Sequence, residues 1–236
     1  MSNVSRKNHF TSGEPESMKI VLFIPIKLNN QRLPGKNLMP LNGRPLCNYI
    51  LETAGGINSI DEKYVYCSDE KILNYISKPW QFLMRDPYLD GSQVKGTEIL
   101  EHFIKDVQAD IYILTHATQP FTKAESIEFA LNKVVNEGYD SAFSAVMIQD
   151  YCWYRGTPLN YSMDNLVTTQ DLEPIYMETG AFFIFRREVF DKFHRRIGEN
   201  PYMHIVDEFE RIDIDTADDF ALAEAVAEYL AKKKQV

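Results

Sequence analysis

Three cations lie within ten residues of a loop that directly follows a short apolar run. The loop covers 27–37 and carries Lys27, Arg32 and Lys36, with Gly35 beside the last of them. Nucleotide transfer from a triphosphate gathers negative charge on the departing pyrophosphate, and cations fixed in advance stabilise that charge. A glycine also lets the backbone approach a phosphate closely. The loop therefore favours phosphate binding, although an ordinary solvated basic loop would have a similar composition.

Two aspartates, Asp213 and Asp215, are separated by one residue near the end of the chain. In extended backbone their carboxylates would share one face. Hard oxygen ligands suit Mg²⁺, which keeps several waters and bridges to substrate phosphates. Such a metal would neutralise and orient the α-phosphate. In the alternative interpretation Asp215 or Thr216 only caps the last helix, a role compatible with metal binding by Asp213.

The elements that must position these residues alternate along the chain. Strands are expected at 19–26, 64–67, 81–84, 111–114, 141–147 and 180–185, and helical segments at 45–54, 70–77, 95–107, 122–137, 187–195 and 217–232. This rhythm predicts an α/β fold with a mainly parallel, Rossmann-like sheet flanked by helices. Ligands of such sheets bind beyond the carboxyl ends of strands. The loops after Ile26, Cys67 and Leu114 should therefore face the site.

One segment, 149–180, interrupts the rhythm. It is rich in Tyr, Asn, Asp and Pro and has no clear amphipathic helix. We interpret it as a lid or a dimerisation insertion within a single domain that covers 18–236. The polar residues 1–17 are expected to form a flexible N-terminal arm.

Charge and cysteine content exclude several classes of protein. The net charge of −9 argues against a general nucleic-acid or anionic-membrane surface, because both require a basic field. No apolar run approaches the length of a membrane helix. The three cysteines, Cys47, Cys67 and Cys152, form no disulfide framework or zinc spacing. We therefore expect a cytoplasmic protein.

Five ordered segments carry a family pattern. They are Ile24-Pro25-Ile26-Lys27 with Arg32-Leu33-Pro34-Gly35-Lys36-Asn37-Leu38, then Tyr64-Val65-Tyr66-Cys67-Ser68-Asp69-Glu70, Leu114-Thr115-His116-Ala117-Thr118-Gln119-Pro120, Thr169-Gln170-Asp171 with Glu178-Thr179-Gly180-Ala181, and Arg211-Ile212-Asp213-Ile214-Asp215-Thr216. Together they resemble the cytidylyltransferases that activate sialic acids and 3-deoxy-octulosonate. Several positions depart from that pattern: Lys27 replaces an arginine, Thr118 an aspartate that binds magnesium in some relatives, and Thr179 an asparagine. The loop also has Leu28, Asn29 and Asn30 where small residues are usual, and Thr122 and Thr168 differ on the acceptor side.

The resemblance implies a role for each matching residue. Catalytic cations would be Lys27, Arg32 and Lys36. Nucleotide contacts would come from Pro25, Ile26, Asn37, Ser68, Asp69 and Arg85. Acceptor contacts would come from His116, Thr118, Arg155, Gln170 and Glu178, and metal ligands from Asp213 and Asp215. Two alternatives stay open: His116 as a structural histidine, and the aromatic stretch around Arg155 as packing for a lid or dimer.

The activity implied is transfer of CMP from CTP to an acidic sugar or similar small acceptor, with Mg²⁺ as cofactor and release of pyrophosphate. A homodimer in surface-glycan precursor synthesis is expected, without nucleic-acid or membrane partners. A non-catalytic nucleotide-binding homologue is one alternative, motivated by Lys27 and Thr118. A nucleotide-sugar-dependent glycosyltransferase using Asp213 and Asp215 is another, although such enzymes carry that motif mid-chain.

Overall fold

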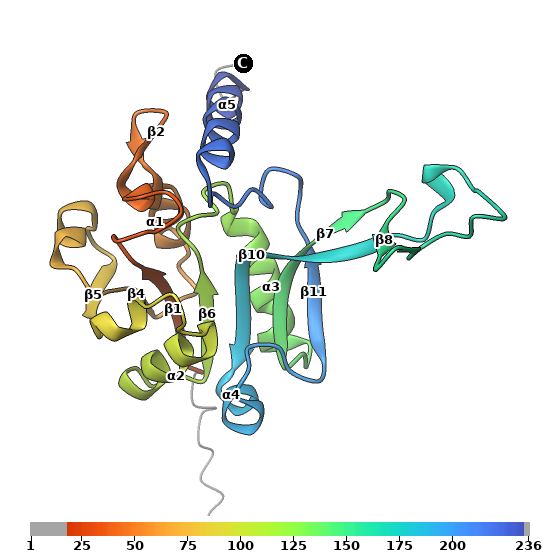
Figure 1. Ribbon diagram of the computed structural model, residues 1–236. Helices are drawn as coiled ribbons and strands as arrows, with labels where there is room; N and C mark the ends of the chain where they lie inside the picture. The colour runs from red at the N-terminus through yellow and green to blue at the C-terminus, as the bar shows by residue number, and fades with distance from the viewer. Residues whose placement is uncertain (1–17, 234–236) are drawn as a thin grey trace, which may run out of the picture.

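Strand β1 (Ile20–Ile26) is an interior strand of a seven-stranded sheet in the computed structural model, which describes residues 18–233 (Figure 1). The flexible N-terminal segment expected at 1–17 lies outside the described residues. Both faces of β1 are covered: Leu22 and Ile24 pack on one side, Val21 and Phe23 on the other. A strand buried on both faces has a continuous apolar sequence, which explains why this run is so clear in the sequence.

The sheet has the order β11-β7-β10-β6-β1-β4-β5. Its other strands are β4 (Glu62–Cys67), β5 (Trp80–Met84), β6 (Ile111–Thr115), β7 (Ser141–Ile148), β10 (Ile175–Arg186) and β11 (Pro201–Ile205). All run parallel except β10, which is antiparallel to β6 and β7. The expected mainly parallel α/β sheet is confirmed.

Helices cover both faces of this sheet. The α-helices of residues 18–233 are α1 (Leu46–Gly55), α2 (Gly96–Asp106), α3 (Ala124–Asn136), α4 (Arg187–Phe193) and α5 (Ala217–Lys233), of which the first four pack on the sheet. One core cluster joins α1 and α3 to the sheet, and a second joins α2 and α4 to the opposite face. A third packs α5 through Phe220 against Leu41 and the buried Ile214. Leu41 belongs to the small hairpin of β2 (Pro40–Leu41) and β3 (Arg44–Pro45), so this cluster links the chain's end to its beginning.

Several elements differ from the sequence expectations. The helix expected at 70–77 is a 3-10 helix over Glu70–Tyr75, in which Ile72 is the one buried residue and no apolar stripe supports a longer helix. Strand β10 begins at Ile175, inside the segment interpreted as an insertion. Strand β11 was not expected, because this edge strand is only half-buried and lacks a continuous apolar run.

The segment 149–180 projects away from the rest of the molecule (Figure 1). It contains the two-stranded hairpin of β8 (Trp153–Tyr154) and β9 (Thr157–Pro158), a 3-10 helix over Thr169–Asp171, and the first part of β10. Its exposed apolar side chains include Trp153, Tyr154, Leu159, Met163 and Leu166. We name this segment the arm. Within residues 18–233, no helix has the length and apolar character needed to cross a membrane.

Candidate active site

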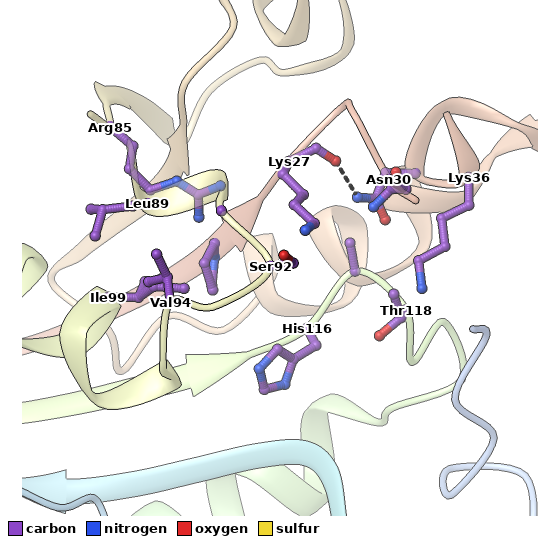
Figure 2. Close-up of a pocket in the computed structure, with 14 residues that line it drawn as sticks. Lys27, Asn30, Lys36, Arg85, Leu89, Ser92, Val94, Ile99, His116 and Thr118 are labelled. Carbon is purple, nitrogen blue, oxygen red and sulfur yellow. Dashed lines mark hydrogen bonds between the residues drawn. The ribbon is translucent and has the colours of Figure 1, made fainter. Parts of the chain in front are cut away.

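A cavity of about 310 Å³ opens beyond the carboxyl ends of β1 and β6 (Figure 2). Seven of the residues assigned to the site from the sequence line it: Pro25, Lys27, Lys36, Asn37, Arg85, His116 and Thr118. These residues come from segments as far apart as the loop after β1 and the loop after β6. The sheet thus assembles them where α/β folds place their ligands.

Lys36 joins the basic loop to the acid pair at the end of the chain. Gly35, with φ of 68°, turns the backbone into a short 3-10 helix that begins at Lys36. The buried Lys36 Nζ donates to the Ile214 carbonyl oxygen at 2.6 Å and to Asp215 Oδ1 at 2.7 Å. Arg32 Nη2 lies 2.8 Å from the same Asp215 oxygen. Residues 179 and more positions apart in sequence therefore share one charged cluster at the cavity edge.

Asn37 and Asn30 present buried acceptor oxygens. Asn37 Nδ2 donates to the Lys27 carbonyl oxygen at 2.8 Å, the contact dashed in Figure 2. Its Oδ1 and the Oδ1 of Asn30 are buried and have no hydrogen-bond partner among residues 18–233. Because unpaired buried polar atoms are costly, this side of the cavity suits a ligand that donates hydrogen bonds through hydroxyl or amino groups.

Arg85 forms the opposite wall and is only 2% exposed. Its guanidinium pairs with Asp90 and donates to the Ile26 carbonyl oxygen at 3.3 Å, whereas its Nε has no partner in the described chain. Ser68 Oγ donates to the second oxygen of Asp90 at 2.5 Å, and Lys27 Nζ to the Asp90 carbonyl at 3.3 Å. Asp90 therefore organises this wall.

Sequence reasoning missed Asp90. A signal for it was present, because a buried arginine such as Arg85 requires a carboxylate partner, and Asp90 lies five residues after Arg85. Ser68 and Asp69 line an adjoining hollow of about 430 Å³ rather than the main cavity. Asp69 Oδ1 accepts from the Lys71 N–H at 2.9 Å, so its observed contact is a cap of the following 3-10 helix.

His116 follows β6 and is one of the residues that line the cavity (Figure 2). Its Nδ1–H donates to the Gly180 carbonyl oxygen at 2.7 Å, which leaves Nε2 as the acceptor in the neutral ring. Burial lowers the pKa of His116, and nearby Arg196 lowers it further, while the Gly180 bond and Asp213 oppose the shift. The ring is thus neutral at neutral pH.

Asp213 and Asp215 lie in irregular backbone on either side of the buried Ile214. The Ile214 N–H donates to the Thr118 carbonyl oxygen at 2.9 Å, which fixes this segment against the loop after β6. Thr216 caps α5, as one alternative expected: its Oγ1 accepts from the Asp219 N–H at 3.2 Å, and Asp219 Oδ2 accepts in return from the N–H groups of Thr216 and Asp215. The Asp215 carboxylate therefore takes no part in capping the helix.

The sequence predicts magnesium ligands at Asp213 and Asp215, and the structure shows which of these carboxylates other side chains already occupy. Across residues 18–233, no cluster of three or more His, Cys, Asp or Glu side chains has the geometry of a metal site. Asp213, however, is exposed and has no hydrogen bond or ion pair to another described residue. Mg²⁺ is typically held by one or two carboxylates together with waters and phosphates; of this pair, Asp215 already pairs with Lys36 and Arg32, which leaves Asp213 as the unoccupied carboxylate.

Three of the expected acceptor residues do not line the main cavity. Arg155 and Gln170 are carried on the arm, where Arg155 lies over the Tyr154 ring at 5.2 Å. Glu178 lies at the base of the arm, on β10, where it pairs with Arg196 at 3.1 Å and lines a separate cavity. The residues expected to contact the acceptor therefore lie in three places: the main cavity, the separate cavity lined by Glu178, and the projecting part of the arm.

A mainly parallel sheet with a cationic loop after its first strand and converging acids at its edge defines the nucleotidyltransferase class of α/β folds. The chain belongs to the cytidylyltransferase family, whose model, described as "Cytidylyltransferase", matches residues 21–235.

Individual relatives agree with this assignment. N-acylneuraminate cytidylyltransferase of Streptococcus agalactiae is 25% identical over 214 residues, which cover 86% of this chain but 52% of that protein. The chain thus spans about half the length of the first relatives it matches. CMP-N,N'-diacetyllegionaminic acid synthase of Legionella pneumophila is 28% identical, covering 89% of this chain and 97% of its own.

A solved structure supports the fold. CMP:2-keto-3-deoxy-manno-octonic acid synthetase, in complex with CTP, superposes with a TM-score of 0.68 at 18% identity, covering 89% of this chain and 99% of that chain.

Proposed function

We propose that this protein transfers CMP from CTP to the hydroxyl of an acidic sugar and releases pyrophosphate. The observation that carries the proposal is the convergence of Lys36 and Arg32 on Asp215 at the edge of the cavity. A triphosphate placed there meets cations from one end of the chain and carboxylates from the other. The family membership and the names of the relatives support CTP as the nucleotide and a sugar acid as the acceptor.

The chain's own residues supply binding and orientation. Lys27, Arg32 and Lys36 bind the phosphates and stabilise the charge that develops on pyrophosphate. Arg85 and the amide of Asn37 line the region for the nucleoside. A magnesium ion bound by Asp213 and Asp215 would supply charge neutralisation at the α-phosphate. The neutral His116 offers Nε2 as an acceptor toward the sugar.

The arm supports a further part of the proposal, a homodimer. Trp153, Tyr154, Leu159, Met163 and Leu166 are all more than half exposed on it. Clustered apolar side chains of this kind are typical of protein interfaces. A partner's arm would also bring Arg155 and Gln170 close to an acceptor, which they do not approach within their own chain. We place the reaction in the cytoplasm, in the synthesis of surface-glycan precursors.

Pyrophosphate release tests the function directly. CTP, UTP and ATP are each incubated with N-acetylneuraminate, legionaminate, pseudaminate or 3-deoxy-octulosonate, with and without Mg²⁺, and pyrophosphate is measured by a coupled assay. The proposal expects release with CTP, dependent on both a sugar acid and a divalent cation. No release with any acceptor would favour the non-catalytic homologue. Tighter binding of a nucleotide sugar than of CTP would favour a glycosyltransferase.

Size-exclusion chromatography with light scattering tests the dimer. Trp153→Asp with Tyr154→Asp should convert a dimer into a monomer, and Phe129→Asp, an exposed aromatic outside the arm, serves as the control. A monomeric wild type would refute this part of the proposal.

A further inference from the structure

A second cavity, of about 460 Å³, lies beside the first, across residues 94–100 at the start of α2. Val94 and Ile99 of this segment face the nucleotide cavity, whereas Lys95, Thr97 and Leu100 face the second one. Because both cavities use the same short stretch of chain, they are neighbours.

Arginine side chains from the loop after α4 form the other wall of this second cavity. Arg196 lies 3.4 Å from the centroid of the Phe183 ring and pairs with Glu178 at 3.1 Å. The Phe183 ring in turn contacts His116 edge-on, with a centroid distance of 6.4 Å. The arginine wall is thus continuous with the residue that lines the acceptor side of the nucleotide cavity.

The loop that carries Arg195 and Arg196 is fixed from below. Asp140 accepts from the N–H groups of Glu199 at 2.7 Å and Asn200 at 2.9 Å. A Cβ on Gly198 would lie only 2.3 Å from the Asp140 carboxylate atoms, so the loop backbone packs directly against Asp140 and leaves no room for a side chain at this position. The arginines therefore project from a held backbone, and less entropy is lost when a ligand binds them.

The charge of the second cavity is positive in a protein of net charge −9. Lys95, Arg195 and Arg196 face it, against the single carboxylate of Glu178. Glu178 pairs with Arg196, while Lys95 and Arg195 form no ion pair with any described residue. Since arginine recognises carboxylates and phosphates through paired N–H groups, this wall suits an anion.

We propose that the acceptor carries a second anionic group, a phosphate or a carboxylate, that binds Arg195 and Arg196. This inference rests on the proposed function. In a 2-keto sugar acid the attacking hydroxyl and the C1 carboxylate share one carbon, so that carboxylate must stay near the α-phosphate in the nucleotide cavity. The cations beyond His116 and Phe183 then contact the other end of the molecule. Arg195 and Arg196 are specificity-determining residues that select acceptors charged at both ends.

Matched acceptors test the inference. N-acetylneuraminate, its 9-phosphate and the derivative with a carboxylate at C9 differ only at the end remote from the reacting hydroxyl. For the wild type we expect kcat/KM to be about 10–100-fold higher for a C9 anion than for the parent acid, as one or two charge-assisted hydrogen bonds provide. Comparison of the 9-phosphate with the C9 carboxylate derivative distinguishes recognition of a phosphate from recognition of a carboxylate.

Variants separate binding from folding. Arg195→Met and Arg196→Met should each bring the ratio between charged and parent acceptors close to one, with KM for CTP unchanged. Glu178→Gln should raise the ratio, because it removes the competing carboxylate. Lys105→Met, an exposed cation elsewhere on α2, is the control and should leave the ratio unaltered.

Three outcomes are decisive. Equal kcat/KM for parent and charged acceptors overturns the inference but leaves the proposed function intact. If none of the three acceptors is turned over, the sugar-acid function is not supported. The inference is then decided by calorimetric titration, which measures the affinity of each variant for the 9-phosphate. Equal affinity of the wild type and Arg195→Met for the 9-phosphate would overturn it, whereas at least tenfold weaker binding by the variant would support it.

Discussion

Replacement of Lys36 by methionine removes the contact that joins the two ends of the chain at the site. The Lys36 side chain is 7% exposed, and its Nζ donates to the Ile214 carbonyl oxygen and to Asp215. Methionine keeps most of the side-chain volume but provides no donor. The Ile214 carbonyl then loses this donor, while Asp215, whose side chain is 29% exposed, keeps Arg32.

The stability loss follows from these contacts. Hydrogen bonds that involve a charged group contribute about 1.5–3 kcal/mol each, and part of this is recovered because a buried charge is removed. We expect a loss of about 3 kcal/mol, or a fall of roughly 6–12 °C in Tm for a chain of this size. If Lys36 also binds the triphosphate, kcat/KM for CTP should fall by about 10²–10³, the usual effect of removing one positioned donor.

Two matched variants isolate the cause. Lys63 is as buried as Lys36 but lies in β4 away from the cavity, where burial lowers its pKa and its Nζ donates to one carbonyl at 3.4 Å. Lys63→Met should preserve kcat/KM for CTP. Arg32→Met removes a 68% exposed partner of the same Asp215 oxygen and should change stability by less than about 1 kcal/mol. Calorimetry and steady-state kinetics measure both quantities. Unchanged Tm and unchanged kcat/KM in Lys36→Met would refute the reasoning.

Three further predictions follow from the site. Asp213→Asn should abolish metal-dependent turnover while Tm stays within about 1 °C, since surface substitutions change stability by about 0.5 kcal/mol or less; a large fall in Tm would indicate a structural role. Gly180→Ala should lower the free energy of unfolding by about 1–3 kcal/mol through overpacking, because its Cβ would lie 2.8 Å from Gln119 Nε2. Gly96→Ala is the control and should not destabilise the protein, because the space around Gly96 is open. His116→Asn should reduce the loss of stability below about pH 6.5: burial lowers the pKa of His116, so the unfolded chain binds the proton first as pH falls and stability declines. The Tm difference between pH 7 and pH 5 measures this, and an equal difference in the variant would contradict it.

Local sequence was sufficient for the central strands. The run at 20–26 is apolar because β1 is covered on both faces, so its strand could be recognised without knowing its neighbours. The helix near the chain end was similarly clear, and α5 begins at Ala217 as expected. Edge and arm elements were less legible, because β11 and the first part of β10 are only partly buried and carry mixed side chains.

The candidate site was partly visible in the same way. Lys27, Arg32 and Lys36 lie within one loop, and Asp213 and Asp215 within one motif, so residue type and spacing marked both groups. Their partners were hidden, because contacts between distant segments leave no local pattern. Asp90 shows this: Arg85, five residues before it, is a local signal for a carboxylate partner, but no local pattern indicates that Asp90 also binds Ser68.

The sequence by itself determined the α/β class, the position of the phosphate loop and the presence of an acid pair, since each depends on neighbouring residues in the chain. Only the tertiary structure decided that Lys36 and Arg32 share the Asp215 carboxylate. It alone separated Arg155 and Gln170 from the cavity and placed Arg195 and Arg196 beside it. The physical reason is that a charged side chain finds its partner through packing of the sheet and helices, which depends on the whole chain at once.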